Sequence, residues 1–315
     1  MFPFYNMPKD TLTIVSWNIN FVYNQWFKRR GELRNVLQDL ASEADICLFQ
    51  EDIIPLYKPP SISSGLFGPP AFASFNCPYI ERGAITRFVH ETFPVRAKVV
   101  ISALSICVEL LFKVASFVFS LCGDTLLNWY FKFPPFGFAL IFFFPYIFVL
   151  AYYFIGISCH VRTALHPTDF TRFDPGHGRL LQSCRCDWNG RNLLLIHVHL
   201  SPNIPSRRLS EIKNIRRYIK ILADKDDIIV VAGDFNSSPG SKEYKLMKRG
   251  GFRSCGPTGP NGHAHTFPAC SPARCIDYVW VKGEGIVVGE SNLLGSSTCS
   301  DHLGLRVVLR HDDGS

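Results

Sequence analysis

The chain has 315 residues, of which 47% are hydrophobic and 19% charged, so it suits one large domain or two small ones and is apolar for a soluble enzyme. Its 11 scattered cysteines exclude a small disulfide scaffold and indicate reduced thiols in a cytosolic compartment. The net charge of +7 favours a polyanionic partner or an anionic membrane surface, although an ordinary basic protein has the same property.

The N-terminal part of the chain predicts strands around one helix. Residues 1–10 lack the pattern of a signal peptide. Residues 11–17 alternate between apolar and polar side chains and predict a strand, whereas residues 27–40 have helical spacing. A short apolar strand is predicted at residues 46–49, and another strand at residues 83–87.

Two long apolar runs follow and predict a membrane hairpin. Residues 99–122 and 137–158 are each long enough to span a bilayer, and the second run contains no charge. The alternative is a buried helical insertion in a soluble core, which Pro145 and a possible Glu109–Lys113 pair on one helix face would suit. The uncharged, Phe-rich second run favours the membrane because such runs are rare in soluble domains.

Basic flanks predict the orientation of this hairpin. The connecting loop carries only Lys132, whereas several basic residues flank the two runs. These residues are Arg82, Arg87, Arg96 and Lys98 before the hairpin and Arg162 and Arg172 after it. The positive-inside rule then places both flanks, and the polar domain, in the cytoplasm. The glycosylation sequon at Asn236 agrees, because a lumenal domain would risk its modification.

The remainder of the chain predicts further strands and an amphipathic helix. Residues 206–222 form the helix, with an apolar stripe from Leu209 to Leu222. The predicted strands cover residues 179–185, 192–199, 228–232, 276–281 and 303–309. We therefore expect one polar domain, built from residues 9–95 and 160–311, that is interrupted by a hairpin at residues 97–159.

Polar side chains recur in one order where these strands end. The six strings are Ser16–Asn20, Gln50–Glu51, His197–Leu200, Gly233–Asn236, Ile276–Tyr278 and Ser300–His302. Each string alone fits a turn or a strand cap as well as a site. Together, in order and at domain-scale spacing, they predict that a sheet delivers carboxylates, amides and imidazoles to a single rim.

This set of side chains suits metal-dependent cleavage of a phosphodiester. A hard cation such as Mg²⁺ offsets the phosphate charge and is held by one or two carboxylates with waters. Glu51, directly after an apolar strand, is the preferred ligand, and Asn18 and Asn20 can add amide oxygens or orient ligands. Asp234 is the candidate base for water, and Asn236 can hold a phosphate oxygen.

Histidines complete the expected chemistry. His199 and His302 can donate hydrogen bonds or protons, and Asp277 or Asp301 can fix a histidine tautomer. His197 alternates with His199 and points to the opposite face, so we assign it to the core. A zinc site is the less favoured alternative, because its candidate ligands lack paired C-x-x-C spacing. These candidates are Cys184, Cys186, Cys255, Cys270 and Cys275 with His263 and His265.

The strings resemble those of the endonuclease/exonuclease/phosphatase superfamily over nearly the whole chain outside the hairpin. The resemblance implies an α/β fold, a four-layer α-β-β-α sandwich of two packed mixed β-sheets. It implies Mg²⁺, with Mn²⁺ as a possible substitute, on Glu51 with help from Asn18 or Asn20 and from Asp301. It also implies that Asp234 and Asn236 act on water and phosphate, that Asp277 orients His302, and that His199 faces the scissile group.

The chain departs from the family pattern at two places. The hydrophobic hairpin is not part of the common pattern, and Ser237–Ser238 replace the Arg of the inositol phosphatase signature. The expected function is therefore a membrane-anchored hydrolase of a phospholipid or sphingomyelin-type head group, with the bilayer as partner and no protein partner. The complete set of acidic and histidine side chains argues against a third possibility, a catalytically dead scaffold.

A membrane-tethered endo- or exonuclease acting on DNA or RNA is the alternative. Its motivation is a basic helix face that could track phosphates. That face comprises Arg207, Arg208, Lys213, Arg216, Arg217 and Lys220, and Asn203, Arg207 and Arg208 are candidates for substrate binding. A contact with anionic lipid, or a solvated surface, is favoured over nucleic acid for these cations.

Overall fold

The computed structural model describes residues 10–20, 26–53, 71–78, 155–176, 179–259 and 262–312. All of them belong to one unit of the chain, which combines residues 1–79 and 154–315. Residues 80–153 are set apart as a second unit, and they lie outside the described residues.

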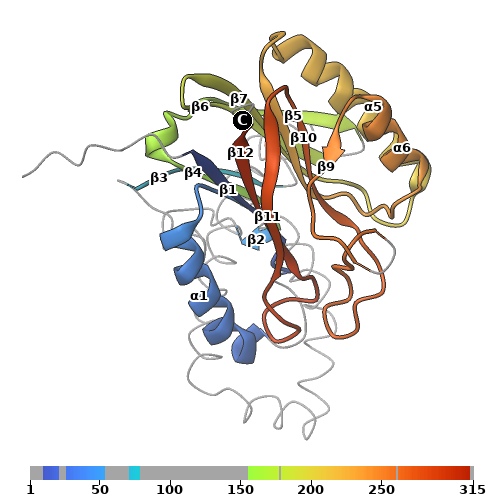
Figure 1. The fold of residues 1–315 in the computed structure, drawn as a ribbon. Helices are drawn as coiled ribbons and strands as arrows, with labels where there is room; N and C mark the ends of the chain where they lie inside the picture. The colour runs from blue at the N-terminus through green and yellow to red at the C-terminus, as the bar shows by residue number, and fades with distance from the viewer. Residues whose placement is uncertain are drawn as a thin grey trace, which may run out of the picture. The chain divides into compact units, whose positions relative to one another are not determined.

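Two six-stranded mixed sheets form the described unit (Figure 1). The first sheet has the order β11-β12-β1-β2-β4-β3, with β1 and β2 parallel. Its strands are β1 Thr11–Asn18, β2 Ile46–Ile53, β3 Phe72–Pro78, β4 Ile155–Arg162, β11 Ile286–Leu294 and β12 Gly304–His311. The second sheet has the order β5-β6-β7-β8-β10-β9, with β7 and β8 parallel. Its strands are β5 Thr168–Gly176, β6 Arg179–Trp188, β7 Arg191–His199, β8 Ile228–Asp234, β9 Arg253–Ser254 and β10 Asp277–Lys282.

The two sheets pack face to face through one apolar core. Ile14 and Leu48 of the first sheet are fully buried in the same cluster as Leu195, Val230 and Val279 of the second. The even spacing of such residues along each strand places them on the inner face, since side chains alternate along a strand. Burial of these side chains supplies most of the free energy that holds the sheets together.

Helices cover the outer face of each sheet. α1 (Trp26–Glu43) buries Leu33, Leu37 and Leu40 against Trp17 and Phe49 of the first sheet. A short 3₁₀ helix, η1 (Thr163–Leu165), follows β4.

The second sheet is covered by two helices. α5 (Pro205–Leu222) and α6 (Lys242–Arg249) bury Ile212, Ile215 and Met247 against the second sheet. The expected α-β-β-α layering of two mixed sheets is therefore confirmed for the described unit.

β4 corrects one of the sequence predictions. Residues 155–158, expected at the end of the second membrane span and in the inserted hairpin, lie in β4, where Ile157 pairs with Gln50. The reason is period-2 burial of apolar side chains: Ile157, Cys159 and Val161 are all buried, and the last two belong to the core between the sheets. Six further elements were not predicted at all: β3, η1, β5, α6, β9 and β11.

The other expectations about the hairpin fall outside the described residues. These are the strand at 83–87, the span at 99–122, the remainder of the second span at 137–154, and the basic flank before them. Among the residues that are described, no helix is both long enough and apolar enough to cross a bilayer.

One edge of the sandwich collects the strand ends that matter for the site. β1, β2, β7 and β8 end there, and β10 begins there, since Asp277 pairs with Asp234. The chain also leaves β3 and enters β4 at this edge, because Gly156 pairs with both Pro78 and Asp52. The chain therefore leaves the described unit after Pro78 and returns to it at Ile155, at the same edge as Glu51.

Close approach of β7 and β8 requires a glycine at this edge. Gly233 has φ +143°, and a Cβ there would lie 1.8 Å from the carbonyl oxygen of Val198. Only glycine fits, because that oxygen belongs to the backbone of the paired strand and cannot move aside without breaking the pairing.

Gly233→Ala is expected to destabilise the protein by roughly 3 kcal/mol or more, since it combines a backbone clash with an unfavourable φ. Gly240→Ala is the matched control, because Gly240 has φ +82° but open space around it. Denaturant unfolding of both variants measures the difference. Equal losses would show that φ alone, and not the approach of β7, requires glycine.

Candidate active site

Asp234 is the hub of the polar rim. It ends β8 and is 1% exposed, between His199 on β7 and Asp277 on β10. Its Oδ2 lies 3.2 Å from Asn18 Nδ2, 3.5 Å from His199 Nε2 and 4.0 Å from His302 Nε2. Strand ends from both sheets therefore converge on one carboxylate oxygen.

The environment of Asp234 favours its protonated form. Burial, and then the charge of Asp277, raise the pKa of Asp234 to about 7. The other oxygen, Oδ1, accepts a hydrogen bond of 2.8 Å from the backbone N–H of Asn236. A carboxyl with a pKa near neutrality can accept and release a proton under physiological conditions.

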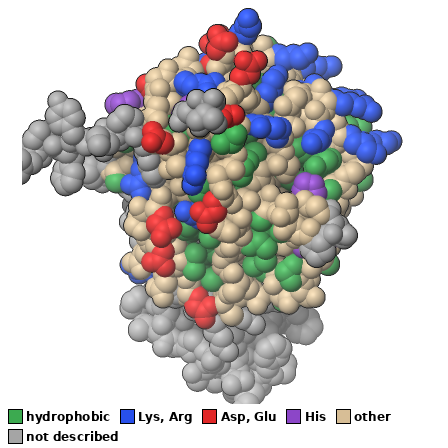
Figure 2. Space-filling view, in the orientation of Figure 1, with side chains coloured by type: hydrophobic (Ala, Val, Ile, Leu, Met, Phe, Trp, Pro, Cys, Tyr) green, Lys and Arg blue, Asp and Glu red, His purple; other side chains and the backbone are tan. Residues whose placement is uncertain are grey.

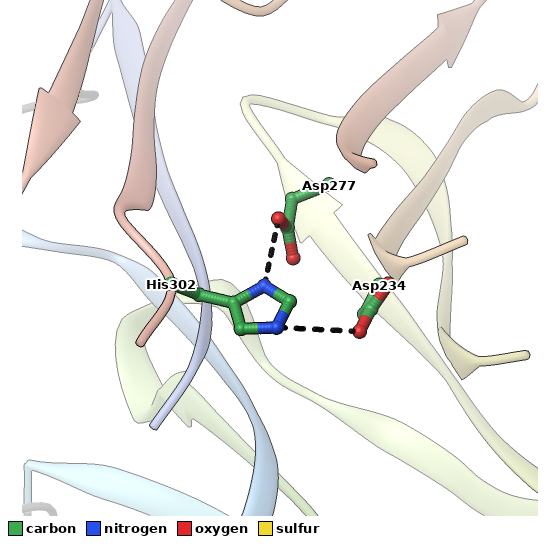
Figure 3. A group of neighbouring side chains, drawn as sticks. All are labelled: Asp234, Asp277 and His302. Atoms are coloured by element: carbon green, nitrogen blue, oxygen red, sulfur yellow. Dashed lines mark hydrogen bonds and ion pairs between the residues drawn. The ribbon is translucent and has the colours of Figure 1, made fainter. Parts of the chain in front are cut away.

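His302 bridges two carboxylates. Its Nδ1 lies 3.0 Å from Asp277 Oδ2, and its Nε2 faces Asp234 (Figure 3). Burial alone would lower the pKa of His302, but the charges of Asp277, Asp234 and Asp301 outweigh it and raise the pKa to about 10. The imidazole is therefore protonated at neutral pH. The role expected for Asp277, which is to orient His302, matches this geometry.

The pKa of His199 is shifted in the opposite direction to that of His302. Burial, and then the positive charges of Arg179 and His302, hold the pKa of His199 well below its usual range. The ring is therefore neutral, with Nε2 3.5 Å from Asp234 and 3.9 Å from Glu51. The rim thus contains one charged and one neutral imidazole, as a site needs when one group donates a proton and another orients substrate.

Glu51 occupies the more open side of the rim. It has φ +54° and sits at a β-bulge, where the pairing of β2 with β4 skips from Gln50 to Asp52. Its Oε1 lies 3.2 Å from Asn18 Nδ2, and its side chain keeps 27% of its surface exposed. Burial is the main cause that raises the pKa of Glu51, and the charge of Asp301 adds to it. The bulge re-aims this carboxylate toward the rim.

Two groups of side chains could hold a cation. Oxygen and nitrogen atoms of Asp234, Asp277 and His302 lie within 4.8 Å of one another, but His302 already links both carboxylates. A cation there would have to displace that imidazole. Glu51 suits Mg²⁺ better, because Mg²⁺ prefers one or two carboxylates with room for waters, and Asp301 adds negative charge nearby.

Asn18 contacts the carboxylates of the rim through its side chain, whereas Asn20 contacts Asn18 through its backbone N–H. Asn18 donates to both Glu51 and Asp234, while its Oδ1 accepts from the backbone N–H of Asn20. Asn18 therefore orients the two carboxylates. Ser300, whose hydroxyl donates to the carbonyl oxygen of Asn18 at 2.7 Å, ties this strand end to the segment that holds Asp301.

Asn236 and the three candidates for substrate binding lie in different environments. Asn236 has φ +50° and donates from Nδ2 to the carbonyl oxygen of Leu200 at 3.0 Å. Asn203 and Arg207 are exposed. Arg208 is buried instead, and its guanidinium pairs with Glu243 at 3.2 Å. This correction removes Arg208 from the basic surface, because a buried ion pair already satisfies its charge.

His197 lies in the core, as predicted. It is fully buried, with Nδ1 3.1 Å from Gln182 Oε1 and Nε2 2.7 Å from Gln50 Nε2. An amide that donates to Nε2 and another that accepts from Nδ1 require the neutral tautomer. Burial accordingly lowers the pKa of His197 to about 3.

The described residues do not assemble the alternative zinc site. Cys184 and Cys186 face the apolar core, and their sulfurs are 3.9 Å apart. His263 bonds to the hydroxyl of Tyr244 at 3.0 Å, and His265 faces a backbone carbonyl. No cysteine joins a metal-binding cluster within the described part of the chain.

Two contributors to the rim were not predicted from the sequence. Arg179 begins β6 and acts electrostatically on both Glu51 and His199. The ring centroid of Phe267 lies 4.7 Å from that of His302, with the two rings tilted by 48°. Neither residue belongs to a polar string, and their proximity depends on strand register and loop conformation, so no local signal identifies them.

Fold and rim together define the class: a two-sheet α/β sandwich with carboxylates, amides and histidines gathered at one edge. The chain matches the model of the Endonuclease/Exonuclease/phosphatase family over residues 15–302, and it belongs to this family. Members of the family are typically metal-dependent hydrolases of phosphoesters. A comparison with curated protein sequences gives no match.

Solved structures share the fold. An endonuclease/exonuclease/phosphatase from Bacteroides vulgatus has a TM-score of 0.61 at 14% identity, covering 96% of this chain and 100% of that one. D. rerio TDP2, in a structure complexed with a single-strand DNA product, has a TM-score of 0.58 at 14% identity with the same coverage. A humanized D. rerio TDP2 gives the same values. At this identity the likeness establishes the fold alone.

Asp277→Asn is expected to lower the pKa of His302 by roughly one unit or more, since the substitution removes the anion bonded to Nδ1. NMR titration of labelled histidine side chains measures this pKa. Asp226→Asn, at an exposed position, is the control. An unchanged His302 titration in the D277N variant would contradict the assigned role of Asp277.

Acid is expected to destabilise the fold through its two neutral core histidines. Burial lowers the pKa of His160 and of His197 from 6.5 to about 3, so only the unfolded chain binds their protons between these values. The contribution of each histidine to the free energy of unfolding is complete above pH 6.5 and declines as the pH falls toward 3. At pH 5 this loss is about 2 kcal/mol per histidine.

Urea unfolding at pH 7 and pH 5 checks this pH dependence. His160→Asn should lose less stability between the two pH values than the wild type, whereas His166→Asn, at an exposed position, should behave as the wild type does. Identical pH dependence in all three proteins would rule out the buried histidines as the cause.

Proposed function

We propose that the chain is a membrane-anchored, Mg²⁺-dependent phosphodiester hydrolase that acts on a phospholipid or sphingomyelin-type head group. The rim of Glu51, Asp234, Asp277 and two histidines supports the hydrolase. The attachment of segment 79–154 supports the lipid substrate. The first apolar run and most of the second lie in this segment, and the chain enters and leaves it at Pro78 and Ile155, beside Glu51, since Pro78 and Asp52 both pair with Gly156.

Charges of the rim suggest how the residues act. Glu51 would hold Mg²⁺, with Asp301 nearby and Asn18 orienting the carboxylate, and the cation would offset phosphate charge. Mn²⁺ is a possible substitute. Asp234 takes a proton from the attacking water, because its pKa of about 7 lets it accept one near neutral pH.

The histidines and Asn236 complete the proposed mechanism. The protonated His302, held by Asp277, donates a hydrogen bond or proton to an oxygen of the phosphate. The neutral His199 faces the scissile group. Asn236 holds a phosphate oxygen, and its own position is fixed by its bonds to Asp234 and Leu200.

Anchoring would place the polar unit in the cytoplasm. The support is the excess of basic residues on both flanks of the apolar runs and the sequon at Asn236. Proximity to the bilayer raises the local concentration of a lipid substrate at the rim. The proposal needs no protein partner.

A membrane-tethered nuclease is the second candidate. D. rerio TDP2, which shares the fold, has been solved with a single-strand DNA product. The exposed cations of α5, including Arg207, could contact a phosphate backbone. A nuclease would lose affinity steeply with added salt, whereas a lipid hydrolase should respond to how its substrate is presented.

Glu51→Gln is expected to reduce Mg²⁺-dependent hydrolysis by about 100-fold or more, since it removes the carboxylate that would hold the cation. The full chain, purified in detergent, is assayed with labelled sphingomyelin, glycerophospholipid and single- and double-stranded DNA and RNA side by side. Glu32→Gln, on the exposed side of α1, is the matched control.

The outcomes separate the candidates. Cleavage of lipid that needs Glu51 supports the head-group hydrolase, and cleavage of nucleic acid alone supports the nuclease. Undiminished activity in the E51Q variant would overturn the proposed mechanism for both.

A further inference from the structure

α5 and α6 present a surface of a single charge sign. The only acidic residue of α5, Glu211, is fully buried and bonds to Ser201. The only acidic residue of α6, Glu243, is buried in its pair with Arg208. The exposed charged side chains of these two helices are therefore all cationic, whereas an ordinary solvated helix exposes both acidic and basic side chains.

The cations gather in one place, which we call the basic face. It comprises Lys213, Arg216, Arg217 and Lys220 of α5 with Lys248 and Arg249 in the last turn of α6. Figure 2 shows Lys and Arg side chains gathered over the region where Figure 1 places these helices. The two helices share the face, since a Cβ on Gly250, which ends α6, would lie 3.1 Å from Arg216 Nε.

Like charges are crowded on the basic face. Lys213 and Arg217, and Arg216 and Lys220, are four residues apart and therefore neighbours on the helix surface, where like charges repel. The four side chains line one surface pocket. None of the four has a carboxylate partner among the described residues. An anionic partner would relieve this repulsion.

The basic face is distinct from the active site. α5 begins shortly after His199 and runs away from the rim. With a rise of about 1.5 Å per residue, Lys213 lies roughly 12 Å and Lys220 roughly 23 Å along the helix. These cations therefore lie too far along α5 to share a phosphate with Asp234, and an anionic partner would meet them at a separate surface.

Ile221 indicates which anionic surface this is. It is 80% exposed, the highest value among the exposed large apolar side chains of the described residues, and it continues the stripe of Lys213 and Arg217 at four-residue spacing. Phosphates of a nucleic acid offer no apolar partner for isoleucine. The aromatic ring on this helix, Tyr218, stacks on Phe173 and bonds to Thr171, so it is not free to stack on bases.

We infer that the basic face binds an anionic lipid bilayer, with Ile221 inserted among the head groups. Cations that contact anionic lipid, combined with an apolar side chain that enters the head-group boundary, are the features of peripheral membrane binding. α5 would then lie along the membrane surface. The inference rests on neither the hydrolytic activity nor the apolar runs of segment 79–154.

Lysine footprinting tests this contact in the intact protein. The full chain is reconstituted into nanodiscs of phosphatidylcholine, with or without about one third phosphatidylserine, and is acetylated briefly. Labelling of Lys213, Lys220 and Lys248 is expected to fall severalfold with phosphatidylserine, relative to lysines elsewhere in the chain, and to recover with added salt.

Two isoleucines at the ends of α5 provide matched variants. Ile221→Ser should reduce the protection by phosphatidylserine severalfold, whereas Ile204→Ser, at the partly exposed start of the helix, should leave it unchanged. Double-stranded and single-stranded DNA are added to neutral nanodiscs in parallel.

Each remaining outcome would overturn the inference. Protection by DNA without protection by phosphatidylserine would assign the basic face to nucleic acid. Equal labelling under all conditions would show a solvated surface. Because no step measures hydrolysis, failure here leaves the proposed function untouched.

Discussion

The arrangement of the rim depends on one interaction, in which the imidazole of His302 lies between the buried carboxylates of Asp234 and Asp277. Asp234 and Asp277 are both almost fully buried at paired positions of β8 and β10, and a cation between two such carboxylates offsets the repulsion between like charges. The protonated His302 is that cation, with one nitrogen toward each carboxylate. Glu51 lies on the more open side of the rim, where Asn18 donates to it at 3.2 Å and 27% of its side chain is exposed.

A second layer of buried charge fixes the backbone beneath the rim. Glu211 accepts hydrogen bonds from both the N–H and the hydroxyl of Ser201, and Arg208 donates to the carbonyl oxygen of Ser201 while it pairs with Glu243. The chain just after His199 is thus tied to α5, and α5 is tied to α6. Rigid support of this kind limits how far the rim can deviate from one geometry.

Much of the fold and site followed from the sequence, because both leave local signals. Alternating or continuous apolar runs located most strands, and polar strings at their ends located Glu51, Asp234 and His302. What failed depends on tertiary pairing. Residues 155–158 at the start of β4 were predicted as the end of a membrane span, because a short buried strand that follows an apolar run continues the same apolar pattern. The sequence predicts Arg208 at the surface because its partner, Glu243, lies on another helix.

The antiparallel pairing of β3 with β4 has a consequence for how this chain could arise. Pro78 and Gly156 are held side by side by the sheet itself, so the two ends of the intervening segment meet whatever its length. Closing a longer loop costs entropy that grows only with the logarithm of its length. The sheet can therefore accept a large insertion at this point without a change in strand register, and relatives could gain, lose or exchange such a segment while the rim stays the same.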